Sequence, residues 1–101
     1  MAKEKEVAWS EEAIADLEAL TEYIARDSAY YAAAFVQKIL DSARSLGELS
    51  KRGRIVPEIA HDNIREIFVR EYRLVYNVEE SRVVILGLIH GKRDLKRLWK
   101  E

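Results

Sequence analysis

Three side chains suited to proton transfer and phosphate binding lie in the second half of this 101-residue chain. Glu58 follows Pro57 where an extended segment ends, and a carboxylate at a strand end can act as a general base. Arg73 lies within an expected strand, where a fixed guanidinium can clamp a phosphate. His90 ends the most apolar segment, and histidine is the natural proton donor or acceptor near neutral pH. Catalysis by this set requires that the fold bring all three into one cavity.

Each of these residues also has a purely structural interpretation. Glu58 is equally suited to be a solvated residue at a sheet edge. Arg73 lies between aromatic residues, so we expect it to point away from the core, where it can form an ion pair with Glu66 or Glu71. His90 can simply be a hydrogen-bonded residue at the end of a strand. The residue types alone leave both interpretations open.

Further basic side chains surround these positions. Lys92 and Arg93 follow His90 and favour a phosphate site there. Basic side chains nearer to Glu58 can extend a basic face: Arg54, Arg65 and Arg70. Arg65 and Arg70 can equally form surface ion pairs of small worth with the glutamates that follow them. Residues 1–50 hold five basic and ten acidic side chains, a net charge of −5, whereas residues 51–101 hold twelve and eight, a net charge of +4. The second half is therefore the candidate region for a phosphate-bearing or acidic partner.

The composition excludes several classes of protein. The chain has no cysteine, its two histidines are far apart, and it contains no glycine-rich phosphate loop, so we expect neither a metal site nor a cofactor. The longest apolar run, residues 83–89, is far shorter than the roughly 20 residues of a membrane span. The first residues lack the apolar stretch of a signal peptide. We therefore expect a cytoplasmic protein without a membrane partner.

The first half predicts a strand followed by two helices. Residues 6–9 read as a short strand. Ser10 is a helix cap with Glu11 and Glu12 in the first turn, and apolar residues then recur at helical spacing as far as Ile24. A second helix is expected from about Ala29, with residue 27 or 28 as its cap, and is expected to stop near residue 47. Because the break is short, the two helices should form an antiparallel hairpin.

The second half predicts strands. Pro57 makes residues 54–58 an edge strand or an extended loop. Residues 64–71, 73–78 and 82–89 read as strands joined by short turns, and the spacing of Leu95, Leu98 and Trp99 allows a short C-terminal helix. The prediction is one α+β domain, residues 1–101, of order β-α-α-β-β-β(-β), with a two-helix hairpin packed on a small antiparallel sheet.

An ordered set of short motifs runs through nearly the whole chain: Trp9 to Ala13, Asp16-Leu17, Tyr23 to Ala25, Gly53 to Glu58, Arg65-Glu66, Tyr72 to Tyr76, and His90 to Leu95. The set resembles the RelE/ParE toxin superfamily of type II toxin–antitoxin systems. The resemblance implies growth inhibition, neutralised by a cognate antitoxin with a segment that folds on binding.

The superfamily has two kinds of target. RelE-like members are ribosome-dependent mRNA endonucleases that need no metal and use the RNA 2′-hydroxyl as nucleophile. Resemblance to them implies that Glu58 is the general base, that Arg73 stabilises the transition state, and that His90 protonates the leaving oxygen. The RNA backbone would be held by Arg54, Arg65, Lys92 and Arg93.

ParE-like members instead poison DNA gyrase and are not nucleases. Two features favour this alternative: Gly91 stands where several nucleases have a tyrosine, and the chain has a net charge of −1, whereas a ribosome-binding toxin is usually strongly basic. Arg73, His90 and Arg93 would then be structural or would contact protein partners. A third hypothesis is a relative that binds its antitoxin without being toxic.

Overall fold

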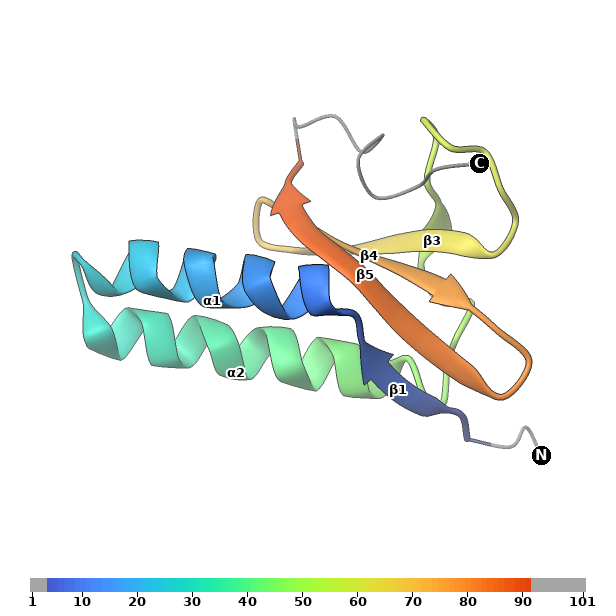
Figure 1. The fold of residues 1–101 in the computed structure, drawn as a ribbon, viewed down its shortest axis with the longest axis horizontal. Coiled ribbons are helices and arrows are strands. Elements are labelled where there is room, and N and C mark those ends of the chain that lie inside the picture. Colours follow the sequence, from blue (N-terminus) through green and yellow to red (C-terminus); the bar gives the residue numbers. More distant parts are fainter. Residues whose placement is uncertain (1–3, 92–101) are drawn as a thin grey trace.

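The computed structural model describes residues 4–91, which form a helix hairpin and a five-stranded sheet (Figure 1). In chain order the elements are β1 (Glu6–Trp9), α1 (Glu11–Ala25), α2 (Ala29–Ser45), β2 (Arg54–Ile55), β3 (Ile64–Val69), β4 (Tyr72–Val78) and β5 (Arg82–His90). This confirms the predicted α+β class and element order. Lys92, Arg93 and the expected C-terminal helix lie outside the described residues. No helix in the described part is long and apolar enough to cross a membrane.

The strands lie in the order β1-β5-β4-β3-β2. Strands β2 to β5 form the predicted antiparallel meander, but β1 runs parallel to β5, with Glu6 opposite Arg82 and Trp9 opposite Ile85. The expectation of a wholly antiparallel sheet is therefore corrected to a mixed sheet. The helix hairpin allows this arrangement because it carries the chain from β1 back to the rest of the sheet, as crossover connections between parallel strands do.

Both helices begin at a serine. The Ser10 hydroxyl accepts a hydrogen bond from the Ala13 amide at 3.1 Å, and the Ser28 hydroxyl accepts one from the Tyr31 amide at 3.1 Å. Ser10 also donates to the Leu86 carbonyl at 3.3 Å. The capping residue of α1 is thereby tied to β5.

The main core lies between the helices and one face of the sheet. Phe35 and Ile39 of α2, with Leu46 just after it, pack with buried side chains of β3, β4 and β5. The fully buried Tyr76 reaches the chain before β2, where its hydroxyl accepts a hydrogen bond from the Gly53 amide at 3.0 Å. A Cβ at Gly53 would lie 2.5 Å from the Glu66 carbonyl oxygen, so only glycine fits this close approach.

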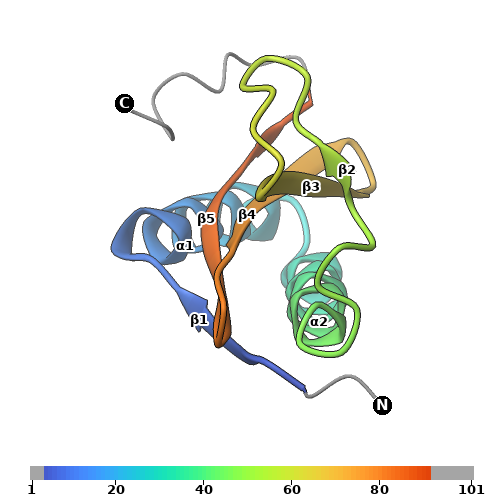
Figure 2. The same cartoon turned by 90° about the vertical axis from the view of Figure 1, so that its right-hand side faces the viewer.

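The opposite face of the sheet is covered by the loop between β2 and β3, seen in Figure 2 on the far side of β3 and β4 from α2. A second, smaller cluster forms there from Val56, Ile64, Val75 and Ile89. Because this cluster shields the middle of β4, Arg73 is only 3% exposed. As expected, Arg73 points away from the main core, but it is buried beneath the loop and not open to solvent.

Candidate functional site

Arg73 is the centre of an ion-pair network on the loop-covered face of the sheet. Its Nε donates to Glu66 at 2.6 Å, and its two terminal nitrogens donate to the two carboxylate oxygens of Glu58 at 2.7 and 2.8 Å. The second Glu66 oxygen accepts from Arg54 Nε at 2.6 Å. Two arginines and two carboxylates thus form one continuous set, in which Glu58 and Arg73 lie together as a bidentate pair.

The elements explain why these residues meet. Glu66 on β3 lies opposite Arg54 on β2 and Val75 on β4. Since alternate residues of a strand share a face, Arg73 and Val75 lie on the same side of β4 as Glu66 on β3. Glu58 is brought to Arg73 by the loop after β2, two residues beyond the fully buried Val56.

Burial differs sharply within the network. The side chains of Glu66 and Arg73 are 0% and 4% exposed, whereas those of Glu58 and Arg54 are 39% and 57% exposed. Two buried groups of opposite charge are therefore each paired a second time with a group at the surface. Such pairing is what allows charged side chains to be buried at all.

The network also shifts the protonation of its members. The hydrogen bonds from Arg73 lower the pKa of Glu58 from 4.5 to about 2. The contact with Glu58 in turn raises the pKa of Arg73 above its ordinary value. Near neutral pH, Glu58 is therefore a fully ionised and very weak base, because a good general base has a pKa close to the working pH.

The Arg73 guanidinium has little capacity left for a ligand. Its Nε and both terminal nitrogens already donate to carboxylates, and one terminal nitrogen also approaches the Gly91 carbonyl oxygen at 3.4 Å. A phosphate group would have to displace Glu58 to reach it in bidentate geometry. The ion pairs of Arg73 therefore join the loop after β2 to strands β3 and β4.

His90 lies on the other face of the sheet. In the β4–β5 register His90 is opposite Tyr72, whereas Arg73 is opposite Ile89. The ring of His90 lies edge-on to Tyr72 at 5.7 Å, and Tyr72 in turn contacts Phe35 of α2 at 5.5 Å. His90 therefore faces the helices, whereas Glu58 and Arg73 face the loop. The fold brings Glu58 and Arg73 together and does not bring His90 to them.

The remaining predicted residues have structural contacts of their own. Arg65 donates to the carbonyl oxygens of Asp62 at 3.0 Å and Gly53 at 2.9 Å, so it holds the chain on either side of β2. Arg54 lies over the Phe68 ring at 5.5 Å in addition to its bond with Glu66. Lys92 and Arg93 lie outside the described residues.

The sequence pattern missed a pocket on the helix-covered face of the sheet. It lies between the turn that joins the two helices and the turn that joins β3 and β4, and several tyrosines line it. Tyr23 and Tyr31 are 62% and 50% exposed, although both lie in helices whose apolar stripes face the sheet. The available signal was their position beside residues 26–28, where the helical apolar stripes are interrupted.

The chain matches the family described as ParE toxin of type II toxin–antitoxin system, parDE, over residues 7–95. It is 33% identical over 89 residues to the toxin RelE2 of Caulobacter vibrioides, a match that covers 87% of this chain and 97% of the relative.

Two solved structures have a similar fold. The chromosomal ParDE toxin–antitoxin system from P. aeruginosa aligns with a TM-score of 0.72 and 20% identity, covering 88% of this chain and 98% of that one. The toxin–antitoxin complex RelBE2 from Mycobacterium tuberculosis aligns with a TM-score of 0.63 and 23% identity, covering 86% and 98%. The family match and the Caulobacter relative each span most of the chain, and this protein therefore belongs to the RelE/ParE superfamily as a ParE-type toxin of a type II toxin–antitoxin system.

Proposed function

We propose that this toxin inhibits growth by binding a protein target, DNA gyrase, and not by cleaving mRNA. The observation that carries the proposal is the division of the three candidate residues between two faces of the sheet. Arg73 is enclosed by Glu58 and Glu66 on one face, and His90 contacts Tyr72 on the other. A concerted proton transfer needs an acid and a base within hydrogen-bond reach of one substrate.

The electrostatics of the site support the same proposal. A Glu58 with a pKa of about 2 has almost no driving force to take a proton from a hydroxyl at neutral pH. The Arg73 charge, which an endonuclease would use on the phosphate, is already balanced by two carboxylates. With a net charge of −1, the chain also lacks the excess of positive charge that drives binding to RNA.

A cognate antitoxin is the second partner that we propose. The matched family is defined by its place in a toxin–antitoxin pair, and both similar solved structures are described as toxin–antitoxin systems or complexes. In this proposal the antitoxin keeps the toxin inactive until the antitoxin is lost.

The target can be tested by inducing the toxin without its antitoxin and labelling cells in parallel with radioactive thymidine and methionine. We expect thymidine incorporation to fall first while methionine incorporation is still intact. An early loss of methionine incorporation would instead mean that translation is the target, and it would overturn the proposal. Normal growth on strong induction would also overturn it, in favour of a relative that binds its antitoxin without toxicity.

His90→Gln separates the two mechanisms at the level of one residue. We expect this variant to retain toxicity within about twofold, because His90 has no chemical step to perform in the proposed mechanism. A general acid in an endonuclease typically contributes roughly 10²–10⁴-fold, so loss on that scale by a variant with an unchanged thermal unfolding midpoint would contradict the proposal. Inhibition of gyrase supercoiling by purified toxin provides the matching measurement in vitro.

A further inference from the structure

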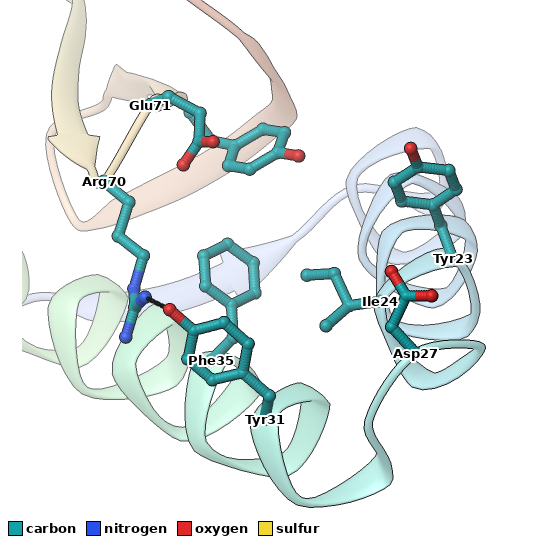
Figure 3. Close-up of a pocket in the computed structure, with 8 residues that line it drawn as sticks. Tyr23, Ile24, Asp27, Tyr31, Phe35, Arg70 and Glu71 are labelled. Atoms are coloured by element: carbon teal, nitrogen blue, oxygen red, sulfur yellow. Dashed lines mark hydrogen bonds between the residues drawn. The ribbon is translucent and has the colours of Figure 1, made fainter.

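The pocket at the tip of the helix hairpin has a volume of about 320 Å³ (Figure 3). Ligand pockets range from roughly 300 to 1,000 Å³, so this one is suited to a single side chain or a small group. It lies at the start of β4, on the helix-covered face of the sheet, and none of the residues of the Arg73 network lines it.

Four of the eight residues that line the pocket are aromatic. Phe35 and Tyr72 meet edge to face at a centroid distance of 5.5 Å and an interplanar angle of 63°. Tyr23 and Tyr31 stand at the rim, at least half exposed, and Ile24 points into the pocket between them in Figure 3. The rings come from α1, α2 and β4. Phe35 is buried at the base of the pocket, and the rings of Tyr23 and Tyr31 are the exposed ones.

Two carboxylates lie in the same pocket wall. Asp27 follows α1 and Glu71 lies in the β3–β4 turn, and among residues 4–91 neither forms an ion pair. Burial raises the pKa of the Tyr72 hydroxyl above its ordinary value, and the negative charge of Glu71 adds to this shift. The charge of Glu71 is therefore felt at the pocket wall. With Arg70 as the one cation in the wall, the lining has a net charge of −1.

Arg70 shows which chemistry the aromatic wall accepts. Its guanidinium lies over the Tyr31 ring, 4.8 Å from the centroid, and donates a hydrogen bond to the Tyr31 hydroxyl. The backbone of Arg70 is left-handed, with a φ of 55°, a conformation that a long side chain rarely adopts in a turn. The arginine is thus kept on the pocket rim despite an unfavourable backbone. A guanidinium of this chain already stacks on one side of the pocket.

We propose that this pocket binds a cationic side chain of a protein partner, and that it prefers arginine to lysine. The aliphatic stem would lie against Ile24 and Phe35, and the charged head between the tyrosine rings and the two carboxylates. A guanidinium stacks on aromatic rings and pairs bidentately with carboxylates, whereas an ammonium does neither as well. The partner is a basic polypeptide segment, since both helices belong to the half of the chain with a net charge of −5. The inference does not depend on the target proposed above.

The proposal can be tested by nuclear magnetic resonance with ¹⁵N-labelled toxin. N-acetyl-arginine amide should cause saturable shifts of the amide signals of Tyr23, Asp27 and Glu71. The neutral analogue N-acetyl-citrulline amide should cause at most a fifth of those shifts, and N-acetyl-lysine amide should bind more weakly than the arginine compound. Equal responses to arginine and citrulline, or shifts scattered over the surface, would overturn the proposal.

A matched pair of variants tests the carboxylates. Asp27→Asn with Glu71→Gln should weaken arginine binding at least fivefold. Glu18→Gln with Glu80→Gln makes the same change in net charge at exposed positions away from the pocket and should leave binding unchanged. All four positions are exposed, so both variants should fold. Equal affinities for the two variants would mean that the pocket carboxylates contribute nothing and would sink the proposal.

The kind of partner is tested by a capped peptide, acetyl-Leu-Arg-Leu-amide. It should bind more tightly than N-acetyl-arginine amide, because a polypeptide can extend over the exposed tyrosines at the rim. If N-acetyl-arginine amide binds more tightly than the peptide, the pocket is a small-molecule site and the assignment of a protein partner is wrong. The readout uses purified toxin, so it can fail or succeed independently of the experiments on gyrase.

Discussion

At the scale of single residues, the one positive charge of Arg73 is paired with two carboxylates. Its guanidinium has carboxylates on both sides, and the surplus negative charge on Glu66 is balanced by Arg54. A buried pair of this kind adds little stability compared with apolar residues of the same volume, but breaking it leaves a buried charge without compensation. The network therefore fixes the path of the loop after β2 and adds little to the free energy of unfolding.

Replacement of Glu66 tests this account. Glu66→Gln keeps the shape of the side chain but removes the carboxylate that Arg73 and Arg54 share. Because Arg73 keeps its pair with Glu58 and Arg54 is 57% exposed, we expect the free energy of unfolding to fall by about 1–3 kcal/mol. Urea denaturation at pH 7 measures the loss. Glu79→Gln is a suitable control, because Glu79 pairs at 2.6 Å with the exposed Arg82, and its denaturation midpoint should barely change. Equal losses in the two variants would contradict the account.

The acid sensitivity of the fold should depend on Glu58. Its pKa falls from 4.5 to about 2 in the folded chain, so its contact with Arg73 stabilises the fold fully above about pH 4.5 and is lost as the pH falls towards 2. Because the Glu58 side chain is 39% exposed, solvent screens the pair, and we expect Glu58→Gln to cost roughly 1 kcal/mol at pH 7.

Denaturation of wild type and Glu58→Gln between pH 2 and 7 measures this dependence. The difference in stability between the two proteins should shrink as the pH falls through that window. A difference that stays constant down to pH 2 would show that the ionised carboxylate is not what stabilises the loop.

The sequence predicted part of this site. An ion pair of Arg73 with Glu66 was one of two alternatives, and it is confirmed. It could be predicted because the alternation of side chains shows which residues of neighbouring strands share a face. The other alternative, Glu71, is wrong, since that residue is exposed and lies in the turn. The contact between Arg73 and Glu58 escaped prediction because it depends on the path of a loop, which no local periodicity specifies.

At the scale of elements, the cap at Ser10 was readable and Ser28 was one of two alternatives, because capping needs only a side-chain oxygen one residue before the helix and the amides just after it. The parallel pairing of β1 with β5 was not readable. A four-residue strand carries no mark of its partner, and its place depends on how the helix hairpin packs. The exposure of Tyr23 and Tyr31 escaped for a related reason, because the helices extend beyond the sheet that covers the rest of their apolar stripe.

The two caps should differ in their contribution to stability. Ser28→Ala removes one hydrogen bond to a helix amide and should lower the free energy of unfolding by about 1 kcal/mol. Ser10→Ala removes a similar bond and also the donor to the Leu86 carbonyl, so we expect a loss of roughly 2 kcal/mol. Thermal or urea denaturation of both variants measures the difference. A smaller loss for Ser10→Ala than for Ser28→Ala would mean that the link to β5 adds nothing.

At the scale of the whole molecule, β5 is the strand on which the fold depends most. It pairs with β4 on one side and with β1 on the other, and its residues contribute to both core clusters. The first strand in the sequence, β1, therefore joins the sheet through the last one, β5.

A chain that stops after residue 81 tests this dependence. We expect it to show no cooperative thermal unfolding and no toxicity, because β1 loses its sheet partner and both core clusters lose side chains. Circular dichroism during heating, together with growth after induction, measures both properties. A truncated chain that still unfolds cooperatively would show that β5 is dispensable.

The parallel pairing of β1 with β5 also sets the timing of folding during synthesis. Glu6 and its partner Arg82 are 76 positions apart in the chain. At about 5–20 residues per second, the first strand waits roughly 4–15 s after its own translation before its partner has been made. Until residues 82–85 have been made, β1 has no strand to pair with. The sheet therefore cannot close around its first strand before its last strand has been synthesised.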